Sequence, residues 1–490
     1  LVWMIPEFNL ADWRDPVTNA PHLPGRLNRE WLDLLAGAES ALRDGDDSRA
    51  SELASRMVEI DGGACAKGSY ILAECSARAG RVDEARRHLG RALDAAGWDA
   101  SRLSTPRPYS YMQEAVREEA GKRPVQLVDL PAVFREYLGG GIPGRRLVID
   151  YCHLTSEGIR VAMAEAAARV VRALTGEEVE PRELAGGCAG PTDEVEAEAS
   201  FLAAVLNAHL YQPYELVRHY CARALELSPH VADLMVNYLE LQTLPRVPLM
   251  MSGPGENLYR LGSRLVQNYL LRLNVKRVEK VLYDATLDAL AGAGVDARAR
   301  LERFRREELG VAGREADLLE YYSLAAVEQP QELAYLYPYA ERRQRHPAEY
   351  YKAYWPESRF VFFADEGDAV RLTLTCRLAA PADADALASV TLNGEAVAGM
   401  AVGREWGTWE IDLAGEAVRD GLNELSVRWP TPEFPGEAAL EGVRLDLFER
   451  KFPAFYPVFG EIHSFTASGG QKGPARPREL ERGTAVLESA

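Results

Sequence analysis

Three features are scarce in this sequence of 490 residues: cysteine, positive charge and long apolar runs. Its six cysteines include no C-x-x-C pair and no cysteine–histidine spacing typical of zinc, which favours free thiols and predicts neither a metal nor another cofactor. The 74 acidic side chains exceed the 56 Lys and Arg, and the net charge of −18 disfavours nucleic acid and anionic membranes as partners. No apolar run reaches about 18 residues, so no membrane-spanning helix is predicted. The interpretation is a globular, cytoplasmic protein.

The first residues, Leu1-Val2-Trp3-Met4-Ile5-Pro6, form an apolar run without an initiator methionine or a basic signal region. Such a run is typical of a buried parallel strand. Because the chain begins within a strand, we expect further residues to precede Leu1. The polar and aromatic segment 6–13 follows, at the strand end where open α/β sheets place groups that contact ligands.

Residues 26–100 have helical periodicity and contain two similar units 35 residues apart. A glycine is followed at the same spacings by small or apolar residues in both units: Gly45, Ala50, Ala54 and Met57, then Gly80, Ala85, Leu89 and Ala92. The length and pattern resemble tetratricopeptide (TPR) repeats, in which helix-turn-helix units stack and often bind other proteins.

Residues 101–175 return to alternating helix and strand patterns. Apolar runs at 125–130 and 146–149 predict strands. The second run leads into Asp150-Tyr151-Cys152-His153-Leu154-Thr155-Ser156-Glu157-Gly158, which puts an acid and an imidazole three residues apart in a short loop. A helix is expected to begin at Thr155 or Ser156, with a stripe of apolar residues that covers the sheet: Ile159, Met163, Ala166, Val170 and Leu174.

These patterns predict a multidomain protein. Segments 1–25 and 101–175 form one partial α/β domain that the helical insertion 26–100 interrupts. A helical, partly repeat-like domain is expected at 192–350, and alternating apolar residues with an Asn393-Gly394 turn predict an antiparallel β-sandwich at 357–450. Residues 468–490 are expected to be a disordered tail.

Three segments together resemble the C-terminal block of the SGNH (GDSL-type) hydrolases: Leu127–Leu130, Gly141–Gly144 and Asp150–Gly158. The resemblance covers about 90 residues and implies a three-layer α/β fold that cleaves esters, often acyl esters of sugars and lipids. It implies that His153 is the general base, that Asp150 orients it, and that Asn9 donates to the oxyanion.

Two departures from the family pattern stand out. Pro6-Glu7-Phe8-Asn9 replaces the usual Gly-x-Asn-Asp, and neither Gly-Asp-Ser nor Gly-x-Ser-x-Gly occurs in the sequence. His153 without a serine performs no covalent acyl transfer. The expectation is an esterase whose serine-bearing N-terminal block is missing from this chain, so that the chain alone is inactive.

The same residues also have purely structural interpretations. Asp150 and His153 fit a simple hydrogen bond at a strand end, Asn9 fits a loop cap, and Glu7 and Asp12 fit solvated or capping groups. Cys152 is expected to point away from His153. His209, His219 and His230 are not expected to hold a metal, because no acidic or cysteine partner falls on the same face. Trp406, Trp409 and Trp429 are expected to pack in a core rather than to stack on a sugar.

Two functions therefore remain. The first is an ester hydrolase that acts on an acylated small molecule or glycan, with a sandwich similar to galactose-binding-like jelly rolls. The second is an interaction scaffold in which TPR-like helices bind a protein partner and the α/β segment is an inactive remnant.

Overall fold

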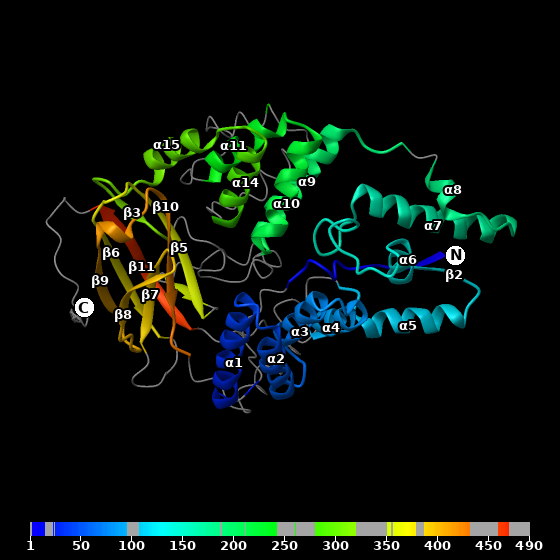
Figure 1. Ribbon diagram of the computed structural model, residues 1–490, viewed down its shortest axis with the longest axis horizontal. Helices are drawn as coiled ribbons and strands as arrows, with labels where there is room; N and C mark the ends of the chain where they lie inside the picture. The colour runs from blue at the N-terminus through cyan, green and yellow to red at the C-terminus, as the bar shows by residue number, and fades with distance from the viewer. Residues whose placement is uncertain are drawn as a thin grey trace. The chain divides into compact units, whose positions relative to one another are not determined.

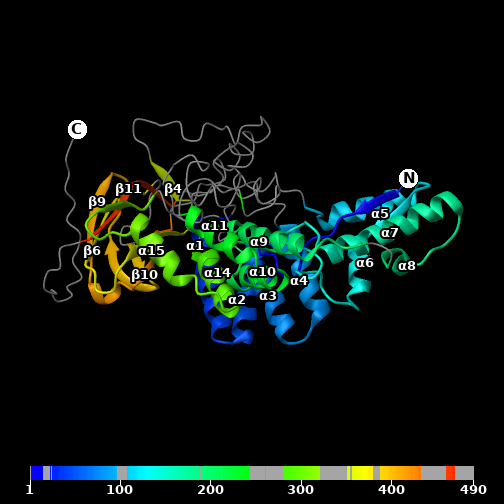
Figure 2. The same ribbon diagram turned by 90° about the horizontal axis from the view of Figure 1, so that it is seen from above.

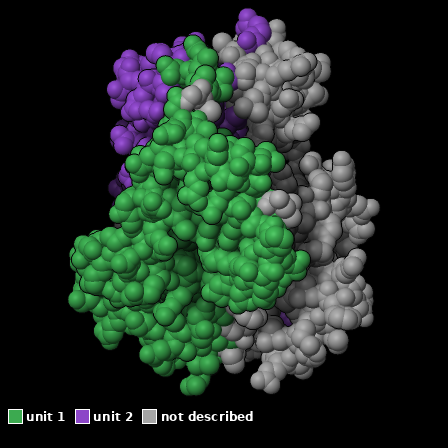
Figure 3. All heavy atoms as spheres, turned by 90° about the vertical axis from the view of Figure 1, so that its right-hand side faces the viewer, with its two compact units in different colours: residues 1–196 green, residues 197–490 purple. Residues whose placement is uncertain are grey.

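The computed structural model describes residues 2–14, 25–95, 107–186, 189–210, 212–242, 280–319, 350–353, 356–378, 387–431 and 459–469, with the single residues 23 and 260. The chain divides into two compact units, 1–196 and 197–490 (Figure 3). The first is mainly helical. The second ends in antiparallel sheets, as the sequence predicts.

Unit 1 is organised around two short parallel strands that lie far apart in the sequence. Strand β1 (Val2–Ile5) pairs with β2 (Gln126–Asp129), from Val2 beside Gln126 to Ile5 beside Asp129. Helices α5 (Ser110–Gly121), α6 (Leu130–Tyr137) and α7 (Ser156–Thr175) pack against this pair (Figure 1). Because both strands run in the same direction, Pro6–Asn9 and the start of α6 leave the sheet at the same edge.

Four helices separate the two strands in the sequence. They are α1 (Gly25–Arg43), α2 (Asp47–Asp61), α3 (Ala66–Arg78) and α4 (Val82–Ala95). Gly45 and Gly80 occupy the turns within the two pairs with positive φ of 76° and 74°, a conformation that glycine adopts without strain. The apolar positions of both units are buried: Ala50, Ala54 and Met57 in one, and Ala85, Leu89 and Ala92 in the other. The predicted helical region is therefore confirmed.

The strand predicted at 146–149 is not present. Arg145–Leu147 form a turn, in which Leu147 N–H donates to Gly144 O at 2.9 Å, and Val148 makes only an isolated antiparallel bridge to Leu154. The apolar run is nevertheless buried, since Leu147 and Val148 are both fully enclosed. The apolar pattern of this run therefore reflects the burial of its side chains. The bridge between Val148 and Leu154 closes a loop and does not add a strand to the sheet.

Helix α7 begins where expected, with Thr155 Oγ1 accepting from Gly158 N–H at 3.0 Å, but it buries a different face. The predicted stripe is largely exposed, with Ile159, Met163 and Leu174 at 50%, 49% and 81%. The buried residues are small: Gly158, Ala162, Ala164 and Ala168. Small side chains let the helix approach the sheet closely, and the large apolar residues lie on the other face. After α7 the chain forms the short helix α8 (Pro181–Ala185).

Unit 2 begins with helices. These are α9 (Asp193–His209, which starts in unit 1), α10 (Tyr214–Leu227), α11 (Val231–Gln242), α14 (Lys280–Gly292) and α15 (Arg298–Leu309). Helix α10 packs on α14, and a buried Cys221 lies 3.5 Å from Thr286 Oγ1 across that contact. The part of the predicted helical domain at 320–349 lies outside the described residues.

The rest of unit 2 forms two antiparallel sheets. One has the order β5 (Glu357–Ala364), β10 (Gly421–Arg428), β7 (Ala388–Leu392) and β8 (Glu395–Met400). The other has the order β3 (Glu315–Asp317), β11 (Gly460–Gly469), β6 (Val370–Arg377) and β9 (Gly407–Leu413), with β4 (Tyr351–Ala353) also on β11 (Figure 2). A single-turn 3₁₀ helix, Gly415–Ala417, precedes β10.

One apolar core joins the inner faces of these sheets. Phe360 of β5 and Phe465 of β11 meet edge to face with ring centroids 4.9 Å apart. The Asn393-Gly394 turn has positive φ at both residues, 52° and 89°, as its sequence predicts. The sheets nevertheless extend past the predicted limits of 357 and 450, because β3 and β11 belong to them. The end of the predicted sandwich, 432–450, and residues 470–490 lie outside the described residues, while Ser468 and Gly469 of the predicted disordered tail belong to β11.

None of the described helices is both long enough and apolar enough to cross a membrane.

Candidate functional site

The Asp150–His153 loop is held closed by backbone hydrogen bonds on both sides. Ile149 N–H donates to His153 O at 2.7 Å, and Thr155 N–H donates to Leu147 O at 2.9 Å. Asp150 is 1% exposed, and its Oδ1 accepts from the N–H groups of Cys152 and His153, both at 2.8 Å. One carboxylate oxygen therefore fixes the turn, which leaves the other for the imidazole.

That second oxygen contacts the histidine ring directly. His153 Nδ1 lies 2.6 Å from Asp150 Oδ2, while the His153 side chain is 58% exposed. The hydrogen bond with Asp150, helped by Cys152, raises the pKa of His153 from 6.5 to about 11. His153 is thus an imidazolium at neutral pH, and its Nε2 must lose a proton before it acts as a base. No described side chain bonds to Nε2, which leaves it available to a reacting group.

The segment after β1 packs directly on this loop. Asn9 N–H donates to Tyr151 O at 3.1 Å, and the Tyr151 ring lies against Trp13 with centroids 5.2 Å apart. Asn9 is fully buried: its Nδ2 is 3.5 Å from Val148 O, and its Oδ1 accepts from Asp12 N–H at 3.0 Å. The structure brings Asn9 beside the Asp150–His153 loop, with its amide directed to backbone groups that join the two segments.

Glu7 and Asp12 are not solvated, but each accepts from a backbone N–H, which fits the capping alternative. Asp12 accepts from Arg145 N–H at 2.6 Å and Nε at 2.8 Å, which ties the segment after β1 to the loop before Val148. Glu7 is only 5% exposed, and one of its oxygens accepts from Phe8 N–H at 2.8 Å. Burial raises the pKa of Glu7 to about 7.

Cys152 does not point away from His153 as expected. Its Sγ lies 3.9 Å from His153 Nδ1, because the tight turn around Asp150 folds the two side chains together. The thiol therefore faces the nitrogen that Asp150 already holds. A nucleophile activated by His153 must instead contact Nε2. Among the described residues, Asp150, Cys152 and His153 are also the one group with donor atoms close enough for a metal, within 4.8 Å of one another.

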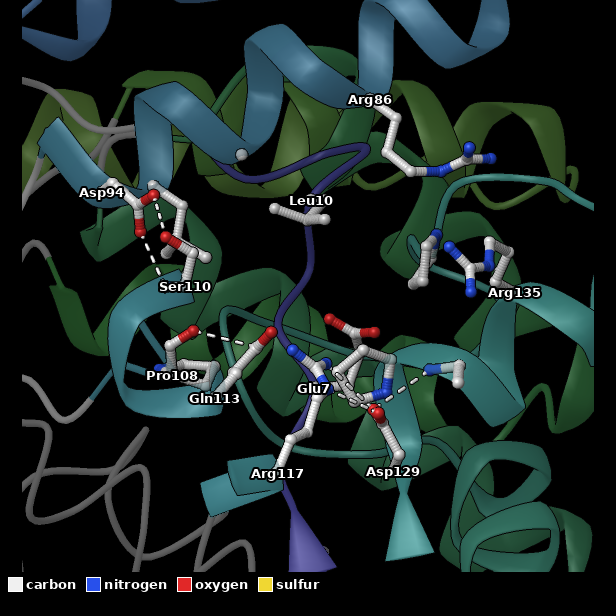
Figure 4. A pocket seen from close by; sticks show the side chains of 15 residues that line it. Glu7, Leu10, Arg86, Asp94, Pro108, Ser110, Gln113, Arg117, Asp129 and Arg135 are labelled. Atoms are coloured by element: carbon white, nitrogen blue, oxygen red, sulfur yellow. Dashed lines mark hydrogen bonds and ion pairs between the residues drawn. The ribbon is translucent and has the colours of Figure 1, made fainter. Parts of the chain in front are cut away.

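A cavity of about 360 Å³ opens on the other side of the same segment. Glu7 and Leu10 line it from the end of β1, Asp129 and Arg135 from the end of β2 and from α6, and Arg86 from α4 (Figure 4). Both strands point towards it with their carboxyl ends. Sequence reasoning missed this cavity. The available signal was that Glu7, two residues after β1, and Asp129, the last residue of β2, both lie at the carboxyl ends of parallel strands.

The other candidates lie in unit 2. The His209 ring is buried, with Nε2 3.3 Å from Tyr238 Oη, and His230 Nδ1 lies 2.7 Å from Ser228 Oγ. Trp409 and Trp429 are buried in the sandwich core. Trp406 is half-buried, with the Arg377 guanidinium 4.5 Å from its ring centroid.

Comparisons with known proteins give little for this chain. No protein-family description matches the sequence, and no curated protein matches it. Among solved structures it is similar to a GH26-CBM35 β-(1,4)-mannanase from Podospora anserina, at 11% identity and a TM-score of 0.16. The match covers 26% of this chain and 22% of the mannanase chain. A likeness at that level carries no argument about function.

Proposed function

We propose that unit 1 carries the acid–base half of a serine-dependent ester hydrolase of the SGNH type. The observation that carries this proposal is the Asp150–His153 pair, in which a fully buried carboxylate holds Nδ1 of a half-exposed imidazole at 2.6 Å. In a hydrolytic triad the acid fixes the tautomer and orientation of the base in this way. The ion pair also stabilises the imidazolium that forms when the base takes the proton of a nucleophile.

The nucleophile of this proposal is a serine outside these 490 residues. No Gly-Asp-Ser segment occurs in the sequence, and no described Ser, Thr or Cys side chain bonds to His153 Nε2. The serine would approach Nε2 on the exposed side of the ring. Asn9 would contribute to the oxyanion site only after its Nδ2 leaves Val148 O, and the long 3.5 Å contact makes that exchange inexpensive.

Acyl esters of small molecules or glycans are the proposed substrates. The reaction starts from His153 with Nε2 unprotonated. The serine attacks the ester carbonyl, its proton moves to His153 Nε2, and the alcohol leaves after receiving that proton. Water then hydrolyses the acyl-enzyme by the same proton transfers. The site needs no metal or cofactor for these steps.

The test uses the protein expressed from its complete gene, with p-nitrophenyl acetate as substrate and a fluorophosphonate probe for the serine. His153→Ala should lower kcat by roughly 10⁴-fold and abolish probe labelling, because the serine loses its base. Cys152→Ser is the matched control on the same loop and should retain turnover. Turnover that persists in a folded His153→Ala variant would refute the proposal.

A scaffold function is the second candidate. It is favoured by the two buried helix-turn-helix pairs α1–α2 and α3–α4, and by the lack of a nucleophile at His153 among the described residues. In that case the natural protein has no esterase activity, and the α/β segment serves as a support.

A further inference from the structure

The cavity behind the segment after β1 is separate from the acid–base pair. Glu7 and Leu10 face the cavity, whereas Asn9 and Trp13 face Tyr151 on the other side. The walls come from the helical insertion and from the strand ends, all within unit 1. Its volume lies at the small end of the range of small-molecule sites.

Most charged groups around this cavity are neutralised by the protein itself. Arg117 donates to both oxygens of Asp129, at 2.7 and 3.1 Å. Asp94 accepts from Ser110 N–H at 2.8 Å and also from its hydroxyl. Arg86 pairs with Asp83 on its own helix and donates to Gly140 O, while its buried Nε has no hydrogen-bond partner. A ligand therefore gains little from contact with Asp94, Arg117 or Asp129.

Two titratable groups remain. Glu7 is a carboxyl with 5% exposure, and only one of its oxygens has a hydrogen bond, from Phe8 N–H. Arg135 lines the same cavity from α6, is exposed, and has no ion-pair partner among the described residues. The two do not pair with each other. Burial raises the pKa of Glu7, and the charges of Arg117 and Arg135 lower it. The cavity wall thus carries a Glu7 oxygen without a hydrogen bond and, apart from Glu7, the guanidinium of Arg135 (Figure 4).

We propose that this cavity binds a small zwitterion of the amino-acid type with an apolar side chain. Its ammonium group would donate to Glu7, and its carboxylate would accept from Arg135. The side chain would contact the apolar part of the wall, formed by Leu10, Leu93 and Pro108. A molecule without an ammonium group leaves the buried carboxyl of Glu7 unmatched, and one without a carboxylate lacks the ion pair with the exposed Arg135, so each should bind more weakly. This proposal does not depend on the ester-hydrolase proposal.

The test is calorimetric titration of the full chain with L-leucine, L-valine and L-methionine at millimolar concentrations. At least one should bind, while its N-acetyl derivative and its amide should bind at least about tenfold more weakly. Glu7→Gln and Arg135→Gln should each cause a similar loss. Glu136→Gln is the matched control, because Glu136 is an exposed neighbour on α6 that does not line the cavity.

A second variant tests the cavity without removing a charge. Gly90 lies on α4 at the wall, and a Cβ added there meets no atom within 4 Å. Gly90→Leu should fill the space and abolish binding while the circular dichroism spectrum is unchanged. Three results would each overturn the proposal: no binding of any of the three amino acids, equal binding of the N-acetyl derivative, or unchanged affinity in a folded Gly90→Leu variant.

Discussion

At the scale of single residues, Asp150 controls the pKa of His153. Its buried carboxylate raises the pKa of His153 above 6.5, so the imidazolium form is favoured in the folded state. For a raised histidine pKa, the contribution to stability is fully present below 6.5 and is lost as pH rises through the folded pKa. The proposed ester hydrolysis needs the unprotonated Nε2, so its rate should rise as pH rises towards the folded pKa of His153.

Asp150→Asn should bring the pKa of His153 down towards 6.5, because the amide keeps a hydrogen-bonding group but removes the charge. Titration of the imidazole nitrogens by ¹H–¹⁵N NMR measures this shift directly. His230 is the internal control, because it bonds to Ser228 and not to Asp150, so its NMR resonances should stay unchanged. A wild-type His153 that titrates near 6.5 would contradict the assigned role of Asp150.

At the scale of elements, the position of Gly158 in α7 fixes the loop that carries Asp150. A Cβ at Gly158 would lie 2.2 Å from Leu147 O, which is the carbonyl that accepts from Thr155 N–H. Gly158→Ala should therefore lower the free energy of unfolding by about 2 kcal/mol and displace the loop. Gly90→Ala is the matched control: it is also helical but open, and should raise stability by about 0.5–1 kcal/mol. Urea denaturation of both variants provides the comparison, and equal effects would contradict the argument.

The same elements show where sequence reasoning holds and where it stops. The cap at Thr155 and the turn at Asn393-Gly394 were predictable, because local side-chain chemistry sets them. The buried face of α7 was not, because close approach to the sheet selects small residues such as Ala162 over the larger apolar stripe. The acid–base pair was predictable from its spacing in one loop. The cavity was not, because the pairing of β1 with β2 brings Glu7 and Asp129 together and the packing of α4 adds Arg86.

At the scale of the whole molecule, the buried apolar clusters described for this chain each lie within one unit. Val128, Phe134 and Ala162 belong to a cluster of unit 1, and Phe360 and Phe465 belong to the sandwich core. Removing a fully buried aromatic side chain costs about 3–5 kcal/mol, and that loss is felt by the residues that pack around it. Substitutions at distant, independent sites have additive effects. The two cores should therefore respond separately to mutation.

Phe465→Ala should destabilise the sandwich by about 3–5 kcal/mol in urea denaturation while the NMR titration of His153 stays unchanged. Phe134→Ala is the reciprocal variant, because Phe134 packs with Val148 next to the Asp150 loop. It should disturb the His153 resonances and leave the transition of the sandwich in place. If Phe465→Ala instead shifted the pKa of His153, the two units would be energetically coupled. The acid–base pair would then depend on the whole chain and not on unit 1 alone.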